Sequence, residues 1–330
     1  MQPPPNLVEL ASRYWESAAL NAAVQLNLFP PLCGQTPQSA AAVAEQCGLS
    51  PRHTTALLDA LTALAILVKH EETYAVRPEL IPLLDPDSPD CLLGALAFNG
   101  DLMGLWLNLP RCVREGKPAI PDNPHLGSDP DRMRRFVAGM HSRAGIMARG
   151  VVPRLSIPSG SRILDVGGGP GTFSVKLLER DASLQATVLD LPPVVQAAAE
   201  LHAGNPVLSR LEFLGGDYHQ TPFPDQQDVV LYSGALHQEP EAGILPLFER
   251  MRAALTPGGM LYVVDLMLKP DRTAPVYSTL FELNMMLMRP QSRVYATDRV
   301  AEILHQTGFL ADLPEEVPGT PYTLFRARAS

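Results

Sequence analysis

The sequence predicts an α/β protein in two parts, an all-helical N-terminal part followed by a sheet domain. Three observations support this. The chain has 330 residues, which is too long for one ordinary domain and about right for two. Before about residue 155, apolar residues recur at the three- and four-residue steps of helices. From Ser161 onward, short apolar runs alternate with helical segments, as in a parallel sheet.

Composition narrows the possible classes of protein. With 46% hydrophobic and 18% charged residues, the chain can bury a sizeable core. No stretch approaches the roughly 18–20 consecutive apolar residues of a membrane span. The opening Met-Gln-Pro-Pro-Pro lacks the basic start of a secretory signal. The four cysteines form no C-x-x-C pair, which excludes a zinc ribbon. We therefore expect a cytoplasmic protein with reduced thiols.

Three helices and a hairpin are predicted in the first hundred residues. Pro30 and Pro31 stop the first helix. The third helix has Ser50 as its N-cap and Pro51 at its first position. The predicted elements are helices over 7–28, 39–48 and from 51 onward, and strands over 66–68 and 73–76.

This order of elements is the layout of a winged helix, whose usual partner is DNA. Charge opposes that function. Residues 1–100 hold four basic and ten acidic residues, a net charge of -6 that repels phosphate, and the whole chain carries -9. We favour a dimerisation module, in which a second copy covers the apolar side chains from Tyr14 to Leu28. A ligand-responsive winged-helix regulator is the less favoured alternative.

Residues 101–155 are predicted to form a helical linker. An apolar cluster around Trp106 precedes a segment, 132–155, with six arginines. Such a segment can line a substrate cleft, although methionines and aromatic residues at helical spacing more often belong to a core. His141 is the histidine in this segment for which we consider contact with substrate. The other histidines apart from His237 are expected to be solvated (His53, His70, His125, His202, His219 and His305).

The domain over 156–330 is predicted to be a parallel sheet covered on both faces. Ligands of such sheets bind at the carboxyl ends of the strands, where the strand order reverses. The predicted strands cover 162–167, 185–190, 211–217, 228–233, 260–265 and 322–328, and the predicted helices cover 172–180, 193–202, 241–255, 279–288 and 297–307.

A glycine-rich loop follows the first of these strands. Glycines let the backbone approach a ligand closely, and the following helix N-terminus favours negative charge. From Gly167 and Gly169, a dinucleotide motif requires its third glycine at position 172, but this glycine comes at Gly171. The Lys-Ser/Thr of a P-loop is absent as well. The loop therefore indicates a nucleoside-like ligand without a pyrophosphate, with a tight turn and no ligand as the alternative.

Two acids reinforce this interpretation. Asp190 ends the second strand, where a carboxylate can accept hydrogen bonds from both ribose hydroxyls. Its alternative role is that of N-cap for the helix that begins at Pro192–Pro193. Asp217 follows the third strand and can accept from an adenine amino group. The three features predict a nucleoside site at one edge of the sheet.

Five motifs together resemble those of a known family. They are Leu-Asp-Val-Gly-Gly-Gly-Pro-Gly at 164–171, Leu-Asp-Leu-Pro at 189–192, Gly-Gly-Asp-Tyr at 215–218, Gly-Ala-Leu-His at 234–237 and Ala-Leu-Thr-Pro-Gly-Gly at 254–259. The chain resembles, over nearly its whole length, the S-adenosylmethionine-dependent O-methyltransferases of the plant caffeate/hydroxyindole and bacterial polyketide-tailoring type. The resemblance implies a Rossmann-like methyltransferase sheet, S-adenosylmethionine as cofactor, and a homodimer formed by the winged-helix-like domain over 1–100.

The resemblance also implies roles for individual residues. His237 corresponds to the general base of the family and Asp265 to the acid that orients it. The residues implied to hold the cofactor are Gly167 and Gly169 at its methionine part, Asp190 at the ribose, Asp217 and Tyr218 at the adenine, and Ser233 nearby. No metal is implied.

The sequence departs from the family pattern at two places. The family usually has His-Asp-Trp where this chain has His237-Gln238-Glu239. A family glutamate aligns near Arg293, and Glu282 is the residue that could partly substitute for it. Some proteins of this fold have exchanged methyl transfer for rearrangements, and the acceptor atom can be oxygen, carbon or nitrogen. These alternatives stay open beside O-methylation of a small aromatic or polyketide-like metabolite.

Overall fold

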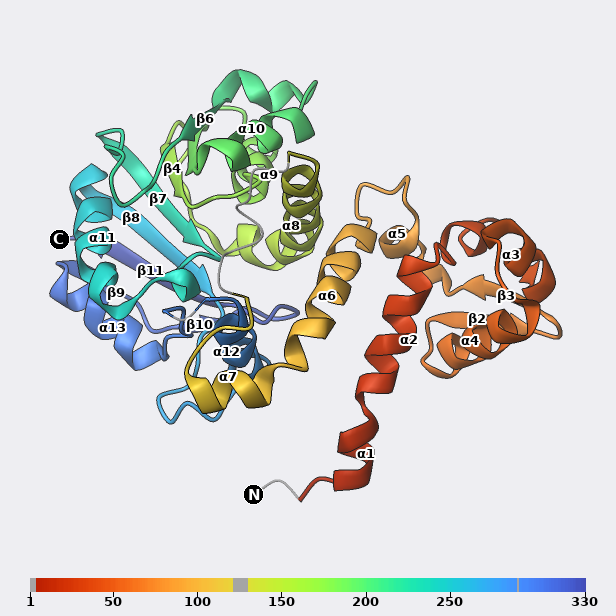
Figure 1. Ribbon diagram of the computed structural model, residues 1–330. Helices are drawn as coiled ribbons and strands as arrows, with labels where there is room; N and C mark the ends of the chain where they lie inside the picture. The colour runs from red at the N-terminus through yellow and green to blue at the C-terminus, as the bar shows by residue number, and fades with distance from the viewer. Residues whose placement is uncertain (1–3, 121–129, 290) are drawn as a thin grey trace. The chain divides into compact units, whose positions relative to one another are not determined.

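The computed structural model describes residues 4–120, 130–289 and 291–330. The chain divides into two compact units, Met1–Met103 and Gly104–Ser330. Figure 1 shows both, with the strands of the large sheet in the second. Within the described residues, no helix is both long and apolar enough to cross a membrane.

The first unit is helical with a small sheet, as predicted. Its hairpin is confirmed, and a short third strand extends it to the order β1-β3-β2. The core of the unit contains Leu28, Phe29, Leu58 and Tyr74. The elements are α1 (Leu7–Ser12), α2 (Tyr14–Gln25), β1 (Gln38–Ser39), α3 (Ala40–Cys47), α4 (Pro51–Ala63), β2 (Leu67–His70), β3 (Thr73–Val76), α5 (Ile81–Leu84) and α6 (Leu93–Trp106), which includes the boundary between the units.

The single helix predicted over 7–28 is wrong, because the chain forms two helices there with a break at Arg13. The hydroxyl of the preceding Ser12 donates to the carbonyl oxygens of Val8 and Glu9. Such bonds compete with the helical ladder. Ser50 occupies the N-cap position of α4, but its side chain lies 3.0 Å from the ring of His53 and caps no backbone N–H.

The second unit contains a sheet with the strand order β10-β11-β8-β7-β4-β5-β6, in which β9 also pairs with β11. Its strands are β4 (Arg162–Val166), β5 (Gln185–Asp190), β6 (Leu211–Gly215), β7 (Gln227–Ser233), β8 (Leu255–Asp265), β9 (Phe309–Ala311), β10 (Glu315–Glu316) and β11 (Thr323–Ala329). Its helices are α7 (Leu109–Glu115), α8 (Pro130–Val151), α9 (Thr172–Arg180), α10 (Pro192–Leu201), α11 (Glu241–Ala254), α12 (Val276–Met288) and α13 (Thr297–Gln306).

The predicted parallel pairing holds for the five strands β4 to β8. It is wrong for the last strand, because β11 runs antiparallel to β8, as do the short strands β9 and β10 to β11. Strand β8 also begins at Leu255 rather than at 260, and its pairing with β7 shifts register between Gln227 and Val229. Strand β8 advances five residues there while β7 advances two, so three extra residues of β8 accommodate the Pro-Gly-Gly turn within the strand.

Helices cover both faces of the sheet (Figure 1). On one face, α11 and α13 pack through Phe248 and Ile303 onto a core that includes Tyr232 and Phe325. On the other face, α8 and α9 pack through Val151 and Leu177 onto a second core. The strand order reverses at β4, because β5 and β6 lie on one side of it and β7 and β8 on the other. Ligands of doubly wound sheets bind at this point, beyond the carboxyl ends of the strands.

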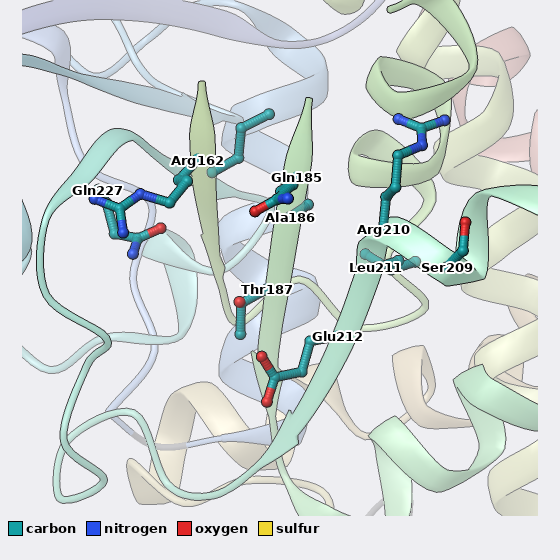
Figure 2. A pocket seen from close by; sticks show the side chains of 10 residues that line it. Arg162, Gln185, Ala186, Thr187, Ser209, Arg210, Leu211, Glu212 and Gln227 are labelled. Atoms are coloured by element: carbon teal, nitrogen blue, oxygen red, sulfur yellow. The ribbon is translucent and has the colours of Figure 1, made fainter. Parts of the chain in front are cut away.

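A polar cavity of about 400 Å³ lies at the opposite edge of the sheet. Figure 2 shows its lining, which includes Arg162, Gln185 and Leu211 at the starts of β4, β5 and β6. The connection over 216–226, between β6 and β7, contains no helix. The Arg210 guanidinium in this cavity already donates to three backbone carbonyl oxygens. We assign no function to this cavity.

Candidate functional site

The candidate site lies at the carboxyl edge of the five parallel strands. Asp190 is the last residue of β5, Ser233 of β7 and Asp265 of β8. The glycine-rich loop, which starts at Gly167, follows β4, and Asp217 follows β6. Because the five strands are parallel, these residues share one edge of the sheet, where the sequence predicted them.

Some positions of the glycine-rich loop have no room for a side chain. A Cβ atom at Gly168 would lie 2.6 Å from the carboxyl carbon of Asp165. At Gly169 the backbone has φ +54°, a left-handed conformation that glycine adopts without strain. A Cβ at Gly169 would meet nothing within 4 Å, so the backbone there borders open space. The loop therefore offers bare backbone to a ligand.

Asp190 holds this loop in place. Its two carboxylate oxygens accept hydrogen bonds from the backbone N–H of Gly169, at 2.8 Å, and of Leu191, at 2.7 Å. Burial raises the pKa of Asp190, and the two N–H donors oppose that rise. Helix α10 has Leu191 as its N-cap and no capping side chain, so the alternative role of Asp190 as N-cap is wrong. Each oxygen keeps a lone pair for a ligand hydroxyl.

Asp165 lies beneath the loop and was not singled out from the sequence. Its Oδ2 accepts a 2.7 Å hydrogen bond from Ser174 of α9, whereas its Oδ1 has no partner among the described residues. Burial raises the pKa of Asp165 to about 7. A buried oxygen without a donor, next to open loop backbone, fits a ligand that carries a donor or a cation, such as the amino-acid end of S-adenosylmethionine.

Tyr218 and Glu239 form a second buried group beside the loop. The Tyr218 hydroxyl donates to Glu239 Oε1 at 2.7 Å, and the His219 Nε2 lies 3.0 Å from Glu239 Oε2. The Tyr218 ring would lie 3.2 Å from a Cβ at Gly167. Burial raises the pKa of Tyr218 far above its usual value. Tyr218 therefore flanks the loop with its ring, while its hydroxyl satisfies Glu239.

The Asp217 carboxylate accepts hydrogen bonds from the turn that follows it. One oxygen accepts from the backbone N–H of His219 and the other from the Gln220 side chain, each at 2.9 Å. The side chain is half-buried at the carboxyl edge. A contact between Asp217 and an adenine stays a prediction, since the remaining lone pairs would have to make it.

His237 and Asp265 form a hydrogen-bonded pair. His237 Nδ1 lies 2.8 Å from Asp265 Oδ1, and the backbone N–H of His237 donates to Oδ2 at 3.3 Å. Leu266 N–H donates to Oδ1 as well, and Asp265 is completely buried. A carboxylate partner assigns the ring proton to Nδ1, which leaves the Nε2 lone pair free. The arrangement is that of a base whose ring is oriented by an acid.

Neither residue considered for the missing family glutamate contacts the imidazole of His237. The Arg293 side chain pairs with Glu241 at 2.7 Å, and its backbone N–H donates to the His237 carbonyl oxygen. Both oxygens of Glu282 accept from Arg272, at 2.7 and 2.9 Å. Glu282 therefore pairs with Arg272, and a role for it in place of the family glutamate stays a prediction.

His141 and His202 brace the glycine-rich loop from behind. His141 Nδ1 lies 2.9 Å from the Thr172 hydroxyl, and His202 Nε2 lies 2.8 Å from the Pro170 carbonyl oxygen. The two rings pack edge to face with centroids 5.1 Å apart. Burial lowers both pKa values, that of His141 to about 4. The expectation that His202 is solvated is wrong, since it is 6% exposed. His125 lies outside the described residues.

Part of the helical segment before the sheet packs into cores of the second unit. Met133 and Val137 of α8 pack against Val194 and Ala198 of α10. Trp106 donates a 3.1 Å hydrogen bond from its indole N–H to a side chain of α12. These contacts agree with the core alternative for this segment. Its role in lining a substrate cleft stays a prediction.

Asp165→Asn tests the burial of the carboxyl beneath the loop. The carboxyl ionises near 3.8 in the unfolded chain and at about 7 in the folded one. Between those values the folded state binds more protons, so Asp165 makes the protein less stable as the pH rises. Thermal unfolding without added ligand should show the variant gaining stability relative to the wild type from pH 4 to 7. The exposed Asp225→Asn is the control, and a flat difference for Asp165→Asn would contradict the assignment.

Comparison with known families matches both parts of the chain. Residues 8–78 match the O-methyltransferase dimerisation domain, and residues 114–310 match the O-methyltransferase domain. The second match alone covers more than half of the chain.

Individual relatives agree with these matches. The chain is 30% identical over 311 residues to the tetracenomycin polyketide synthesis 8-O-methyl transferase of Streptomyces glaucescens, covering 93% of this chain and 91% of the relative. It is 29% identical to a 3-hydroxy-5-methyl-1-naphthoate 3-O-methyltransferase of Streptomyces sahachiroi, covering 86% and 83%. The fold matches the structure of human N-acetylserotonin methyltransferase with a TM-score of 0.87 at 23% identity, over 100% of both chains. The chain therefore belongs to the family of S-adenosylmethionine-dependent O-methyltransferases.

Proposed function

We propose that this enzyme methylates a hydroxyl group of a small aromatic or polyketide-like metabolite, with His237 as the general base. The observation that carries the proposal is the 2.8 Å contact between His237 Nδ1 and buried Asp265, at the same strand edge as the glycine-rich loop. Relatives named for polyketide and naphthoate hydroxyl groups support an aromatic acceptor.

The residues at the edge fit the proposed cofactor. Asp190 would accept from the ribose hydroxyls, Asp217 and Tyr218 would contact the adenine, and the loop at Gly167 and Gly169 would hold the methionine part. Ser233 ends β7 beside them and is 8% exposed. When bound, S-adenosylmethionine supplies a methyl carbon activated by a sulfonium. The enzyme's remaining tasks are to orient the acceptor and to remove its proton.

His237 performs the proton transfer in this proposal. The acceptor O–H gives its proton to Nε2, since Nδ1 keeps its own proton in the hydrogen bond to Asp265. The imidazolium that forms lies against the buried Asp265 carboxylate, which stabilises its charge. A phenol has a pKa near 10, so a base within hydrogen-bond reach increases the fraction of nucleophilic oxygen.

Alternatives differ in what they require of His237. An amine acceptor is nucleophilic once it is neutral, so an oriented base favours a hydroxyl acceptor over nitrogen. Carbon methylation and rearrangement would be recognised by the mass and position of the product. A DNA-binding regulator would bind DNA more weakly as salt increases. The acidic first hundred residues oppose that function.

Asp190→Ala tests the cofactor site. It should weaken binding of S-adenosylmethionine by about 10- to 100-fold, because a charged acceptor worth about 1.5–3 kcal/mol is lost and the Gly169 N–H is released. Isothermal titration calorimetry measures this. The control is Glu212→Ala, which removes an exposed acid of β6 in the polar cavity at the opposite edge of the sheet. This variant should bind the cofactor like the wild type. Wild-type affinity in Asp190→Ala would refute the assignment.

His237→Ala tests the general base. Turnover should fall by about 10²–10⁴ with affinity for S-adenosylmethionine nearly unchanged, because the ring acts on the acceptor. Asp265→Asn should cause a smaller loss, since Asp265 acts through the histidine. Steady-state kinetics on the best acceptor from a screen of phenols and enols measures both. The exposed His305→Ala is the control, and wild-type turnover in His237→Ala would show that no base is needed.

We also propose that the first unit forms a homodimer. Its first two helices expose Leu7, Val8, Tyr14 and Trp15, which are 72%, 81%, 64% and 63% exposed. These side chains lie within or beside the segment that matches the dimerisation domain. A second copy would remove this apolar surface from water.

Trp15→Glu tests the dimer. Sedimentation velocity should show a dimer for the wild type at micromolar concentration and a shift toward monomer for Trp15→Glu, because a buried charge opposes association. Leu313→Glu, at an 88% exposed site of the second unit, should remain dimeric. A wild-type protein that stays monomeric as its concentration increases would end this proposal.

A further inference from the structure

Two half-buried arginines differ from the other half-buried arginines of the described residues in their side-chain hydrogen bonds. Every other half-buried arginine donates a hydrogen bond to an acid or to a backbone carbonyl oxygen. Arg143 of α8 and Arg289, which follows α12, donate none from their side chains. Partial removal of a guanidinium from water without an acceptor is unfavourable, and a carboxylate or phosphate ligand matches its donors.

The two arginines have different surroundings. Arg289 lies near the buried carboxylate of Glu239, which favours its charge, although burial lowers its pKa. The Arg143 guanidinium carbon instead lies 5.9 Å from the centre of the Phe281 ring. Arg143 also lies close enough to the buried Tyr322 to oppose the rise that burial causes in the pKa of that phenol. Of these two arginines, Arg143 is therefore the one whose described contacts are an aromatic ring and a phenol rather than an acid.

Phe281 lies next to both Arg143 and the proposed base His237. The His237 ring packs edge-on against Phe281, with centroids 4.9 Å apart. Together with the 5.9 Å distance on the other side, this places the imidazole centre and the guanidinium carbon at most about 11 Å apart. Two fused aromatic rings with a substituent at each end can span such a separation. The Tyr322 hydroxyl, 3.7 Å from a Cβ at Gly234, lies at the same strand edge.

We propose that Arg143 binds a carboxylate on the aromatic acceptor, so that the enzyme prefers hydroxylated aromatic acids to neutral phenols. This inference rests on the proposed function, since it places the acceptor hydroxyl at His237. The planar guanidinium presents paired N–H donors that match both oxygens of a carboxylate. The acceptor ring would lie along Phe281, with its two polar ends held by His237 and Arg143.

The test compares 6-hydroxy-2-naphthoate with its methyl ester, which has nearly the same shape without the charge. For the wild type, kcat/KM should be at least about 10-fold higher for the acid, mainly through KM. Arg143→Met should lower kcat/KM for the acid by about 10- to 100-fold and leave the ester unchanged. Arg143→Lys should recover part of the loss, because it keeps the charge without the fork. Arg135→Met, an exposed arginine of the same helix, is the matched control.

Calorimetry gives a second readout that needs no turnover. Acid and ester are titrated into protein saturated with S-adenosylhomocysteine, and the preference for the acid should disappear in Arg143→Met. Equal binding of acid and ester by the wild type, or equal losses for both in Arg143→Met, overturns the inference and leaves Arg143 as a packing partner of Phe281. Failure of the wild type to bind S-adenosylmethionine would instead refute the proposed function.

Discussion

The parallel pairing of β4 with β5 on one side and β7 on the other is the constraint on which the site depends. A parallel strand must return by a crossover, so its carboxyl end points the same way as those of its neighbours. In this chain the ends carry a glycine-rich loop, Asp190, Ser233 and Asp265. The helices on both faces bury the strands, so the loops at the edge start from fixed positions.

Buried carboxyl groups organise this edge, and each is satisfied differently. Asp190 holds backbone N–H groups of the loop, Asp265 orients an imidazole, and Glu239 takes the Tyr218 hydroxyl. Oε2 of Glu239 lies 3.0 Å from His219 Nε2, whereas Oδ1 of Asp165 has no hydrogen-bond partner among the described residues. Removing a carboxylate from water is unfavourable unless donors replace the water. Three of these carboxyl groups therefore make polar contacts with other parts of the protein through both oxygens, and Asp165 does so through one.

The proposed proton transfer depends on which polar groups around His237 have no partner within the protein. His237 has one ring nitrogen committed to Asp265, which leaves one nitrogen to accept a proton. Phe281 limits the space beside that ring and connects it to Arg143. In the proposed binding mode, an acceptor that contacts both His237 and Arg143 would have an aromatic body between a hydroxyl and an anion. Substrate preference would then be set by helices α8 and α12, while the strand edge provides the common methyl-transfer machinery.

The sequence by itself determined the order of elements and the ends of the main strands. Residue periodicity, glycine and proline positions and local motifs are properties of neighbouring residues. The positions of Gly169, Asp190 and His237 after their strands could therefore be predicted without coordinates, while their roles stay predictions. The short strands β9 and β10, the antiparallel direction of β11 and the burial of His202 were not. A strand of two or three residues has no period to detect, and its direction depends on where the chain returns.

Contacts between distant residues were decided only by the tertiary structure. The sequence did not indicate that Glu282 pairs with Arg272. It also gave no sign that one oxygen of Asp165 has no hydrogen-bond partner. Arg143 meets Phe281 across 138 positions of the chain. Hydrogen bonds and ring contacts form over a few ångströms, and only the packing of α8 and α12 within the second unit brings these side chains that close.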